Sequence, residues 1–271
     1  DNDGDIDYVA GNYGKNALFQ PTEAEPLTAI LADVDQNDAL DFVPFLHLED
    51  QDGSRRAFTF HNRSDVGKQV NKIKKQFTTH SAFATVSPDY FDTATEKDNY
   101  KFTTNFLASI YLENTSDGFV IKELPPSAQA FPIYGMLPFD VNNDDYLDLI
   151  MIGNDHGSET GQGFLDAGNG LVLLGDGKGH FFSLTAQESG FSVPGEARAL
   201  VVVNGKDGPV FVAAQNRGPL VITQPRGGNY TPVPLKESQT IPLKRSSRKV
   251  EPYWGSGYLS QSNRVFWRKN E

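Results

Sequence analysis

Short apolar runs bounded by polar turns recur along most of the chain. TAILA, FVPFL, GMLPF and LIMIG are four of them, and ARALVVVNGKDGPVFVAAQ near the C-terminal end contains two more. Runs of this length, rich in branched and aromatic residues and flanked by Gly, Asn or Asp, are typical of β-strands. The 25 glycines and 16 prolines fit the many turns that short strands need. The pattern predicts an all-β, mainly antiparallel protein.

One stretch departs from this pattern. In DVGKQVNKIKKQF, from Asp65, four apolar residues share one helical face and lysines occupy the other: Val66, Val70, Ile73 and Phe77. This spacing indicates an amphipathic helix packed on the β domain. A second helix is predicted from about Asp89 to Phe106, after which FLASIYLEN returns to β. We therefore expect a helical insertion over residues 65–106.

Acidic residues gather in three segments that share one spacing. They read DNDGDIDYVAGN from Asp1 (loop 1), DVDQNDALDFVPF from Asp33 (loop 2) and DVNNDDYLDLIMIGN from Asp140 (loop 3). Oxygen-bearing side chains recur at positions 1, 3, 5 and 9 of this frame. They are Asp1, Asp3 and Asp7 in loop 1 (positions 3, 5 and 9), Asp33, Asp35, Asn37 and Asp41 in loop 2, and Asp140, Asn142, Asp144 and Asp148 in loop 3.

This spacing suits a hard cation such as Ca²⁺, which takes six to eight oxygen ligands at roughly 2.3–2.6 Å. The backbone carbonyl of position 7 can supply one more oxygen, from Asp5, Ala39 or Tyr146. Position 6 needs a sharp turn with positive φ and holds Gly4, Asp38 and Asp145, all of which are residue types that tolerate it. A single loop of this kind could equally be a solvated turn, but three copies in one frame favour Ca²⁺ as the cofactor.

An EF-hand is the nearest alternative, because its loop starts in the same way. It requires a bidentate Glu at position 12 and flanking helices. Position 12 is Ala10, Pro44 and Met151 here, and the flanks are strand-like. The repeated unit is therefore strand, acidic loop, strand.

Composition narrows the class of protein further. Acidic residues outnumber basic ones by 35 to 24, which gives a net charge of −11 and disfavours nucleic acid as a partner. Cysteine is absent, which excludes disulfides and thiolate metal sites. No apolar run is long enough for a transmembrane helix. The frame places position 1 of loop 1 before Asp1, so we expect the chain to begin inside a motif and to form an incomplete ring with an open edge strand.

The loop pattern followed by a strand and Gly-Asn resembles the FG-GAP or VCBS repeat of integrin-type β-propellers. LVLLGDGKGHFF from Leu171 is similar to the partner signature of these repeats. YWGSGYLSQSNRVFW from Tyr253 is similar to the end region of bacterial secreted proteins related to cartilage acidic protein, of the ASPIC/UnbV type. The resemblance implies a bacterial repeat protein that is secreted or at the cell surface. It also implies a β-propeller whose loops bind Ca²⁺ through the residues above.

Within this frame we expect an incomplete propeller, or one of about four blades. Residues 1–64 would hold N-terminal blades with loops 1 and 2, and 65–106 the helical insertion. Residues 107–235 would hold further blades with loop 3, and 236–271 a tail or closing strand. The position-9 aspartates are 34 residues apart between loops 1 and 2 and 107 apart between loops 2 and 3, so the insertion falls in the longer interval.

No enzyme signature is present, so the expected function is a calcium-binding scaffold that binds a protein or glycan at the cell surface. The alternative is a carbohydrate-active hydrolase or lyase that uses acidic residues near a histidine. GNDHGSETGQGFLDAGNG is the segment that keeps this alternative open, and a ligand could bind there. Its candidate residues are Asp155, His156, Glu159 and Asp166.

Overall fold

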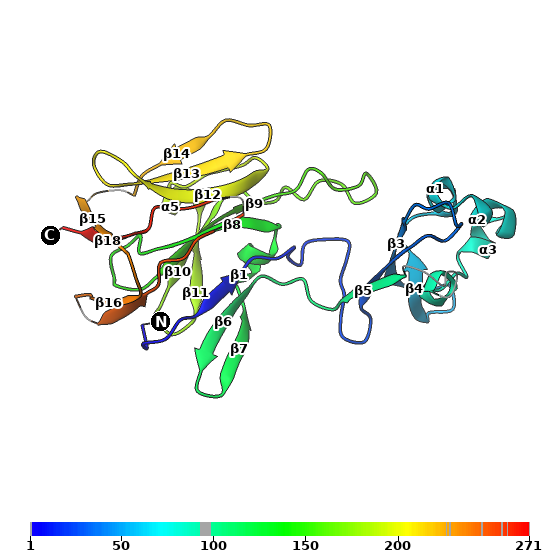
Figure 1. The fold of residues 1–271 in the computed structure, drawn as a ribbon, viewed down its shortest axis with the longest axis horizontal. Helices are drawn as coiled ribbons and strands as arrows, with labels where there is room; N and C mark the ends of the chain where they lie inside the picture. The colour runs from blue at the N-terminus through cyan, green and yellow to red at the C-terminus, as the bar shows by residue number, and fades with distance from the viewer. Residues whose placement is uncertain are drawn as a thin grey trace. The chain divides into compact units, whose positions relative to one another are not determined.

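The computed structural model describes residues 2–92, 99–225, 227, 229–244, 246–255, 257–258 and 260–270. Most of the ordered elements are strands, and every pairing between them is antiparallel. The all-β prediction is confirmed (Figure 1). The chain divides into two compact units: unit 1 is Asp1–Ala17 with Ala108–Glu271, and unit 2 is Leu18–Leu107.

The described residues of unit 1 form three sheets and two two-stranded ribbons. Their orders are β1-β6-β7, β11-β10-β9-β8, β12-β13-β14, β15-β18 and β16-β17. The strands are β1 (Tyr8–Ala10), β6 (Ile110–Thr115), β7 (Gly118–Glu123), β8 (Ile133–Phe139), β9 (Asp148–Gly153), β10 (Leu171–Gly175), β11 (Phe181–Leu184), β12 (Ala197–Asn204), β13 (Pro209–Gln215), β14 (Val221–Thr223), β15 (Tyr230–Pro234), β16 (Gln239–Pro242), β17 (Ser247–Val250) and β18 (Val265–Lys269). A 3-10 turn, η1 (Pro126–Gln129), and a short helix, α5 (Ala186–Ser189), complete the unit.

The buried strand β9 lies at the centre of unit 1. Its residues alternate between two hydrophobic clusters, because successive side chains of a strand point to opposite faces. Ile150 and Ile152 pack into one cluster with β12 and β13, and Leu149 and Met151 pack into the other with β6. A strand buried on both faces fixes loop 3, which directly precedes it, against the core.

Two of the sheets repeat the same arrangement. In each, an acidic loop is followed by the first of three strands that pair in succession. Loop 1 is followed by β1, which pairs with β6, and β6 pairs with β7. Loop 3 is followed by β9, which pairs with β10, and β10 pairs with β11. The four-stranded sheet carries one strand more, β8, which precedes loop 3. The described residues do not show a closed propeller ring.

Unit 2 is a four-stranded sheet with one face covered by helices. The sheet order is β4-β3-β2-β5, and loop 2 joins β2 to β3. The strands are β2 (Leu27–Ala32), β3 (Asp41–Glu49), β4 (Arg55–Thr59) and β5 (Tyr100–Thr104), and the helices are α1 (Arg63–Gln69), α2 (Asn71–Gln76), α3 (His80–Phe83) and α4 (Pro88–Asp92). Figure 1 shows the helices gathered beside β3 and β4.

The predicted apolar face is buried, but the predicted single helix is interrupted: Val70 is extended, with φ −109° and ψ 91°, and separates α1 from α2. Val66, Val70 and Ile73 are all fully buried, and they pack with Ile30 of β2 and Phe45 of β3. The helices and loop 2 therefore share one core. The compact units divide the chain between residues 17 and 18 and between residues 107 and 108. The segments expected from the sequence instead divide it between residues 64 and 65, which separates two parts of this core.

The second predicted helix, from Asp89 to Phe106, is wrong in its C-terminal part. Helix α4 covers only its start, and Tyr100–Thr104 is the strand β5, paired with β2. Pairing supplies the backbone hydrogen bonds of β5, so a partner distant in sequence overrides the local pattern. Residues 93–98 lie outside the described part. No helix among the described residues has both the length and the apolar composition to cross a membrane.

Candidate metal-binding loops

The three loops share one backbone conformation. Positions 4 and 6 both have positive φ in every loop, as the frame predicts for position 6. The values are 73° and 114° for Asn2 and Gly4, 61° and 64° for Gln36 and Asp38, and 62° and 75° for Asn143 and Asp145. These are residue types for which a left-handed conformation costs least, with Gln36 as the exception. The curl turns alternate side chains toward the inside of each loop.

One hydrogen bond recurs in all three loops. The side-chain oxygen at position 5 accepts the backbone N–H of position 7. The pairs are Asp3 Oδ1 with Asp5 N at 3.2 Å, Asn37 Oδ1 with Ala39 N at 2.9 Å, and Asp144 Oδ1 with Tyr146 N at 2.9 Å. The same frame therefore folds in the same way at three places in the chain.

The carboxylate at position 1 closes each loop that the structure describes in full. Asp33 accepts the N–H groups of Asn37 at 2.9 Å and Asp38 at 3.0 Å. In loop 3, Asp140 accepts the corresponding N–H groups of Asp144 at 3.2 Å and Asp145 at 3.1 Å. Position 1 of loop 1 would precede Asp1, and Asp1 itself, at position 3, lies outside the described residues, which include Asp3, Asp5 and Asp7.

The aspartates at position 9 are the most buried ligand candidates. Asp41 is 4% exposed and Asp148 is fully buried. Each accepts the N–H of position 2 of its own loop, Val34 at 3.0 Å and Val141 at 2.7 Å. Burial is the largest cause that raises the pKa of both carboxyls, that of Asp148 to about 6, and the neighbouring carboxylates raise them further. A cation in the loop would favour their charged forms.

Loop 2 brings its carboxylates closest together. Oxygens of Asp33, Asp35 and Asp41 lie within 4.8 Å of one another, the one such trio among the described residues. Asp35 Oδ2 accepts the N–H of Asn71 at 3.3 Å, while its Oδ1 is buried without a hydrogen-bond partner. A buried, unpaired carboxylate oxygen is costly, and a cation relieves that cost. All these ligands are hard oxygens, so the residues present fit Ca²⁺.

Loop 3 has the same fold with a looser set of carboxylates. Asp144 Oδ2 accepts a hydrogen bond from Asn142 Nδ2 at 2.9 Å, so the amide at position 3 takes up an oxygen that could otherwise face a cation. Asp140, Asp144 and Asp148 do not form a trio as compact as that of loop 2. Loops 2 and 3 carry the same number of carboxylates at these positions, but the amide stands at position 5 in loop 2 (Asn37) and at position 3 in loop 3.

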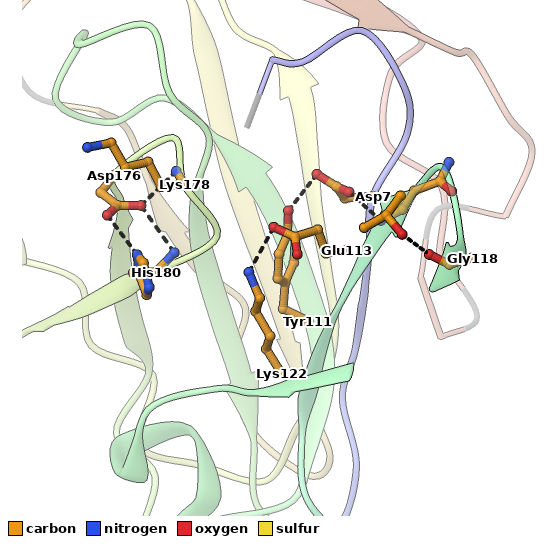
Figure 2. A network of polar contacts seen from close by, with 10 residues as sticks. Asp7, Tyr111, Glu113, Gly118, Lys122, Asp176, Lys178 and His180 are labelled. Carbon is orange, nitrogen blue, oxygen red and sulfur yellow. Dashed lines mark hydrogen bonds and ion pairs between the residues drawn. The ribbon is translucent and has the colours of Figure 1, made fainter. Parts of the chain in front are cut away.

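Several residues that support loops 1 and 3 carry no signal in the sequence frame. Tyr111 on β6 donates its hydroxyl hydrogen to Asp7 Oδ2 at 2.6 Å, and Asn114 N donates to Asp7 Oδ1 at 2.9 Å. Figure 2 shows Tyr111 reaching Asp7, with the Glu113–Lys122 ion pair beside it. The same view shows the turn in which Asp176 accepts hydrogen bonds from the backbones of Lys178 and His180. They lie on or after the strand that pairs with the strand following each loop, so no pattern near the loops marks them.

The segment from Asp155 to Asp166 does not bring its four candidates together. Asp155 accepts hydrogen bonds from Tyr134 and Arg198, both at 3.1 Å, and so belongs to a polar network on β8 and β12. The His156 ring lies against Phe164, with 4.9 Å between centroids. Glu159 and Asp166 are exposed. The segment folds back on itself through paired hydrogen bonds between Asp155 and Leu165.

Comparison with known proteins adds no family to this picture. No family model matches the chain, and no curated protein matches it.

Proposed function

We propose that this chain is a calcium-binding module of an FG-GAP/VCBS-type β-propeller. It would act as an extracellular or cell-surface scaffold for a protein or glycan ligand. The observation that carries the calcium site is the trio Asp33, Asp35 and Asp41, which includes a buried carboxylate oxygen without a partner. The recurrence of one loop conformation at three places, each leading into a strand, supports the repeat architecture.

The proposal implies that Ca²⁺ stabilises unit 2. A ligand that binds the folded state and not the unfolded one raises the free energy of unfolding by RT ln(1 + [L]/Kd). Without the ion, the trio holds three carboxylates at close range, and a like-charge pair about 5 Å apart costs on the order of 3 kcal/mol at an effective dielectric of about 20. Thermal unfolding in millimolar Ca²⁺ should therefore have a higher midpoint than unfolding in excess chelator.

Two matched variants of loop 2 test the site directly. Asp35→Asn removes a proposed ligand, and Asp38→Asn makes the same change of charge at position 6, whose exposed side chain lies outside the ligand set. Isothermal titration with Ca²⁺ should show loss of one tight site in Asp35→Asn and its retention in Asp38→Asn. Equal weakening of Ca²⁺ binding in both variants would mean that the loss of negative charge, and not the loss of a ligand, lowers the affinity. No binding of Ca²⁺ to the wild-type chain would refute the proposal.

The alternative of a carbohydrate-active enzyme gains no support from the segment that suggested it. Paired catalytic carboxylates must face each other across a substrate. Asp155 is instead paired with Arg198, and the other two acids are exposed. We therefore advance the scaffold alone.

A further inference from the structure

A buried arginine lies between loops 1 and 3. Arg248 is on β17, in the ribbon formed with β16, and its side chain is 8% exposed. Its Nε donates to Asn2 Oδ1 at 3.0 Å and its Nη2 donates to the Asp145 carbonyl at 2.7 Å. Asn2 Nδ2 donates to the same carbonyl at 2.8 Å. Three segments of unit 1 are thus joined at one point.

The contact is made at the same kind of place in both loops. Asn2 is position 4 of loop 1 and Asp145 is position 6 of loop 3, the two left-handed positions of the frame. Neither group is a ligand in the frame, which uses the side chains of positions 1, 3, 5 and 9 and the carbonyl of position 7. Both printed hydrogen bonds of Arg248 are therefore made to groups outside the proposed ligand set.

The guanidinium lies within the field of the loop 3 carboxylates. Burial lowers the pKa of Arg248, and the charges of Asp140, Asp145, Asp148 and Asp144 oppose that effect. Arginine stays protonated in proteins, so a full positive charge sits beside the acidic loop. Such a charge is costly to bury without compensation, and here loops 1 and 3 supply two hydrogen-bond acceptors and loop 3 supplies nearby negative charge.

Loop 2 has a lysine beside it instead of an arginine. Lys72 of α2 is half-buried and donates to the carbonyl of Val34, which belongs to loop 2 itself. A lysine on a flexible stem is a compact point charge, whereas the arginine fork fixes two acceptors in one geometry. The two loops therefore differ in the device that compensates their charge, although their ligand frames match.

We propose that Arg248 is the built-in counter-cation of loop 3 and sets its affinity for calcium. It holds loop 3 folded in the absence of metal, and it lowers Ca²⁺ affinity there by charge repulsion. This inference rests on the proposed calcium function and adds a residue that determines the difference between the loops. Loop 3 is then the weaker and preformed site, and loop 2 is the tighter site.

The test separates the charge of Arg248 from its hydrogen bonds. Arg248→Lys keeps the charge but loses the fork, and Arg248→Met keeps much of the volume and loses both. If charge dominates, Arg248→Met should bind Ca²⁺ at loop 3 about tenfold more tightly because the like-charge repulsion is gone, and Arg248→Lys should stay within about twofold of wild type. If both variants bind more weakly, or if Arg248→Met is unchanged, the proposal is overturned.

The affinity of loop 3 can be measured separately from the affinities of the other loops. Tyr146 occupies position 7 of loop 3, where loops 1 and 2 have Asp5 and Ala39. We would load the chain with Tb³⁺, excite tyrosine, and displace the ion with Ca²⁺. The part of the luminescence that is lost in Tyr146→Phe belongs to loop 3, and its displacement gives the affinity of that site.

Stability supplies the second readout. Arg248→Met should show a larger difference in melting temperature between Ca²⁺ and chelator than the wild-type chain, because the metal-free loop has lost its counter-cation. Folding of Arg248→Met in Ca²⁺ but not in chelator would support the proposal in the same way. Should it fail to fold in both, Arg248→Gln, a neutral residue with an amide donor for the Asp145 carbonyl, replaces it.

The outcomes distinguish the two proposals. If the wild-type chain binds no Ca²⁺, the proposed function fails. If the wild-type chain binds Ca²⁺ and loop 3 responds equally to Lys and Met at position 248, only the role of Arg248 fails.

Discussion

The buried carboxylate of Asp148 accepts the backbone N–H of Gly175 at 2.9 Å, which fastens the end of loop 3 to the last residue of β10. Asp7 repeats this relationship with Asn114 on β6. In both cases the donor lies one residue beyond the strand position opposite the aspartate. The position-9 aspartate therefore joins its loop to the neighbouring strand, independently of any bound ion.

Asp148→Asn should destabilise unit 1 both in chelator and in Ca²⁺. The carboxylate accepts two backbone N–H groups, from Gly175 and Val141. An amide has one oxygen, so one buried N–H would face the NH₂ group, at a cost of about 1–3 kcal/mol. Denaturant unfolding followed by tryptophan fluorescence measures this, because both tryptophans, Trp254 and Trp267, lie in unit 1. Asp166→Asn is the exposed control. An unchanged midpoint in chelator would show that Asp148 serves the metal alone.

Gly175→Ala should destabilise the same junction from the other side. A Cβ at this position would lie 2.3 Å from the carbonyl oxygen of Leu147. Relief of that overlap requires backbone movement, which costs about 1–3 kcal/mol. The control is Gly157→Ala, whose Cβ would come no closer than 3.3 Å to the Asp155 side chain. Similar unfolding midpoints for the two variants would contradict the packing described.

Ile73→Ala should unfold unit 2 selectively. Ile73 is fully buried among helix and sheet residues that all belong to 18–107, and truncation of such a side chain costs about 2–5 kcal/mol. Amide hydrogen exchange should accelerate over β2, β3 and the helices, while tryptophan fluorescence reports no change in unit 1. Lys75→Ala, on the exposed side of α2, is the matched control. Equal acceleration in both units would mean that they unfold together.

Acid should weaken the polar network around Glu196. The Glu196 side chain is buried, and burial by itself raises the pKa of its carboxyl. The hydrogen bonds from Arg198 and Asn216 outweigh that effect, so the pKa lies below its ordinary value of 4.5. A depressed folded-state pKa gives stability that is present above the unfolded-state pKa and is lost as pH falls through the folded value. The wild-type chain should therefore exceed Glu196→Gln in stability at neutral pH, with a gap that narrows as the pH falls through the lowered pKa of Glu196. A gap that is constant with pH would refute this.

The loops could be predicted because their signal is local. The aspartate ladder, the turn residues at position 6 and the apolar face of Val66, Val70 and Ile73 each lie within a few residues of chain. The missed features depend on distant partners. Arg248 meets Asn2 across 246 residues and Tyr111 meets Asp7 across 104, and no local pattern marks either contact. Strand β5 was missed for the same reason, since β2 rather than the sequence near Tyr100 determines its conformation.

Loop 3 also shows what the spacing of residues cannot predict. The ligand positions were predicted from spacing, but the hydrogen bond between Asn142 and Asp144 depends on side-chain geometry that spacing does not encode. Loop 2 has an aspartate at the same position, and its three carboxylates do converge. The two sites differ in where the single amide stands, at position 5 in loop 2 (Asn37) and at position 3 in loop 3 (Asn142).

Unit 2 enters unit 1 at the connection between β1 and β6, two neighbouring antiparallel strands. The base of that connection is held within unit 1 itself, where Asn12 N donates to Ser109 Oγ at 3.0 Å. The entropic cost of closing a connection grows only slowly with its length, so two paired strands whose connection is held at its base can accommodate a large inserted unit. An insertion of this kind leaves the strand register of unit 1 unchanged, and loop 2 lies wholly within the inserted unit.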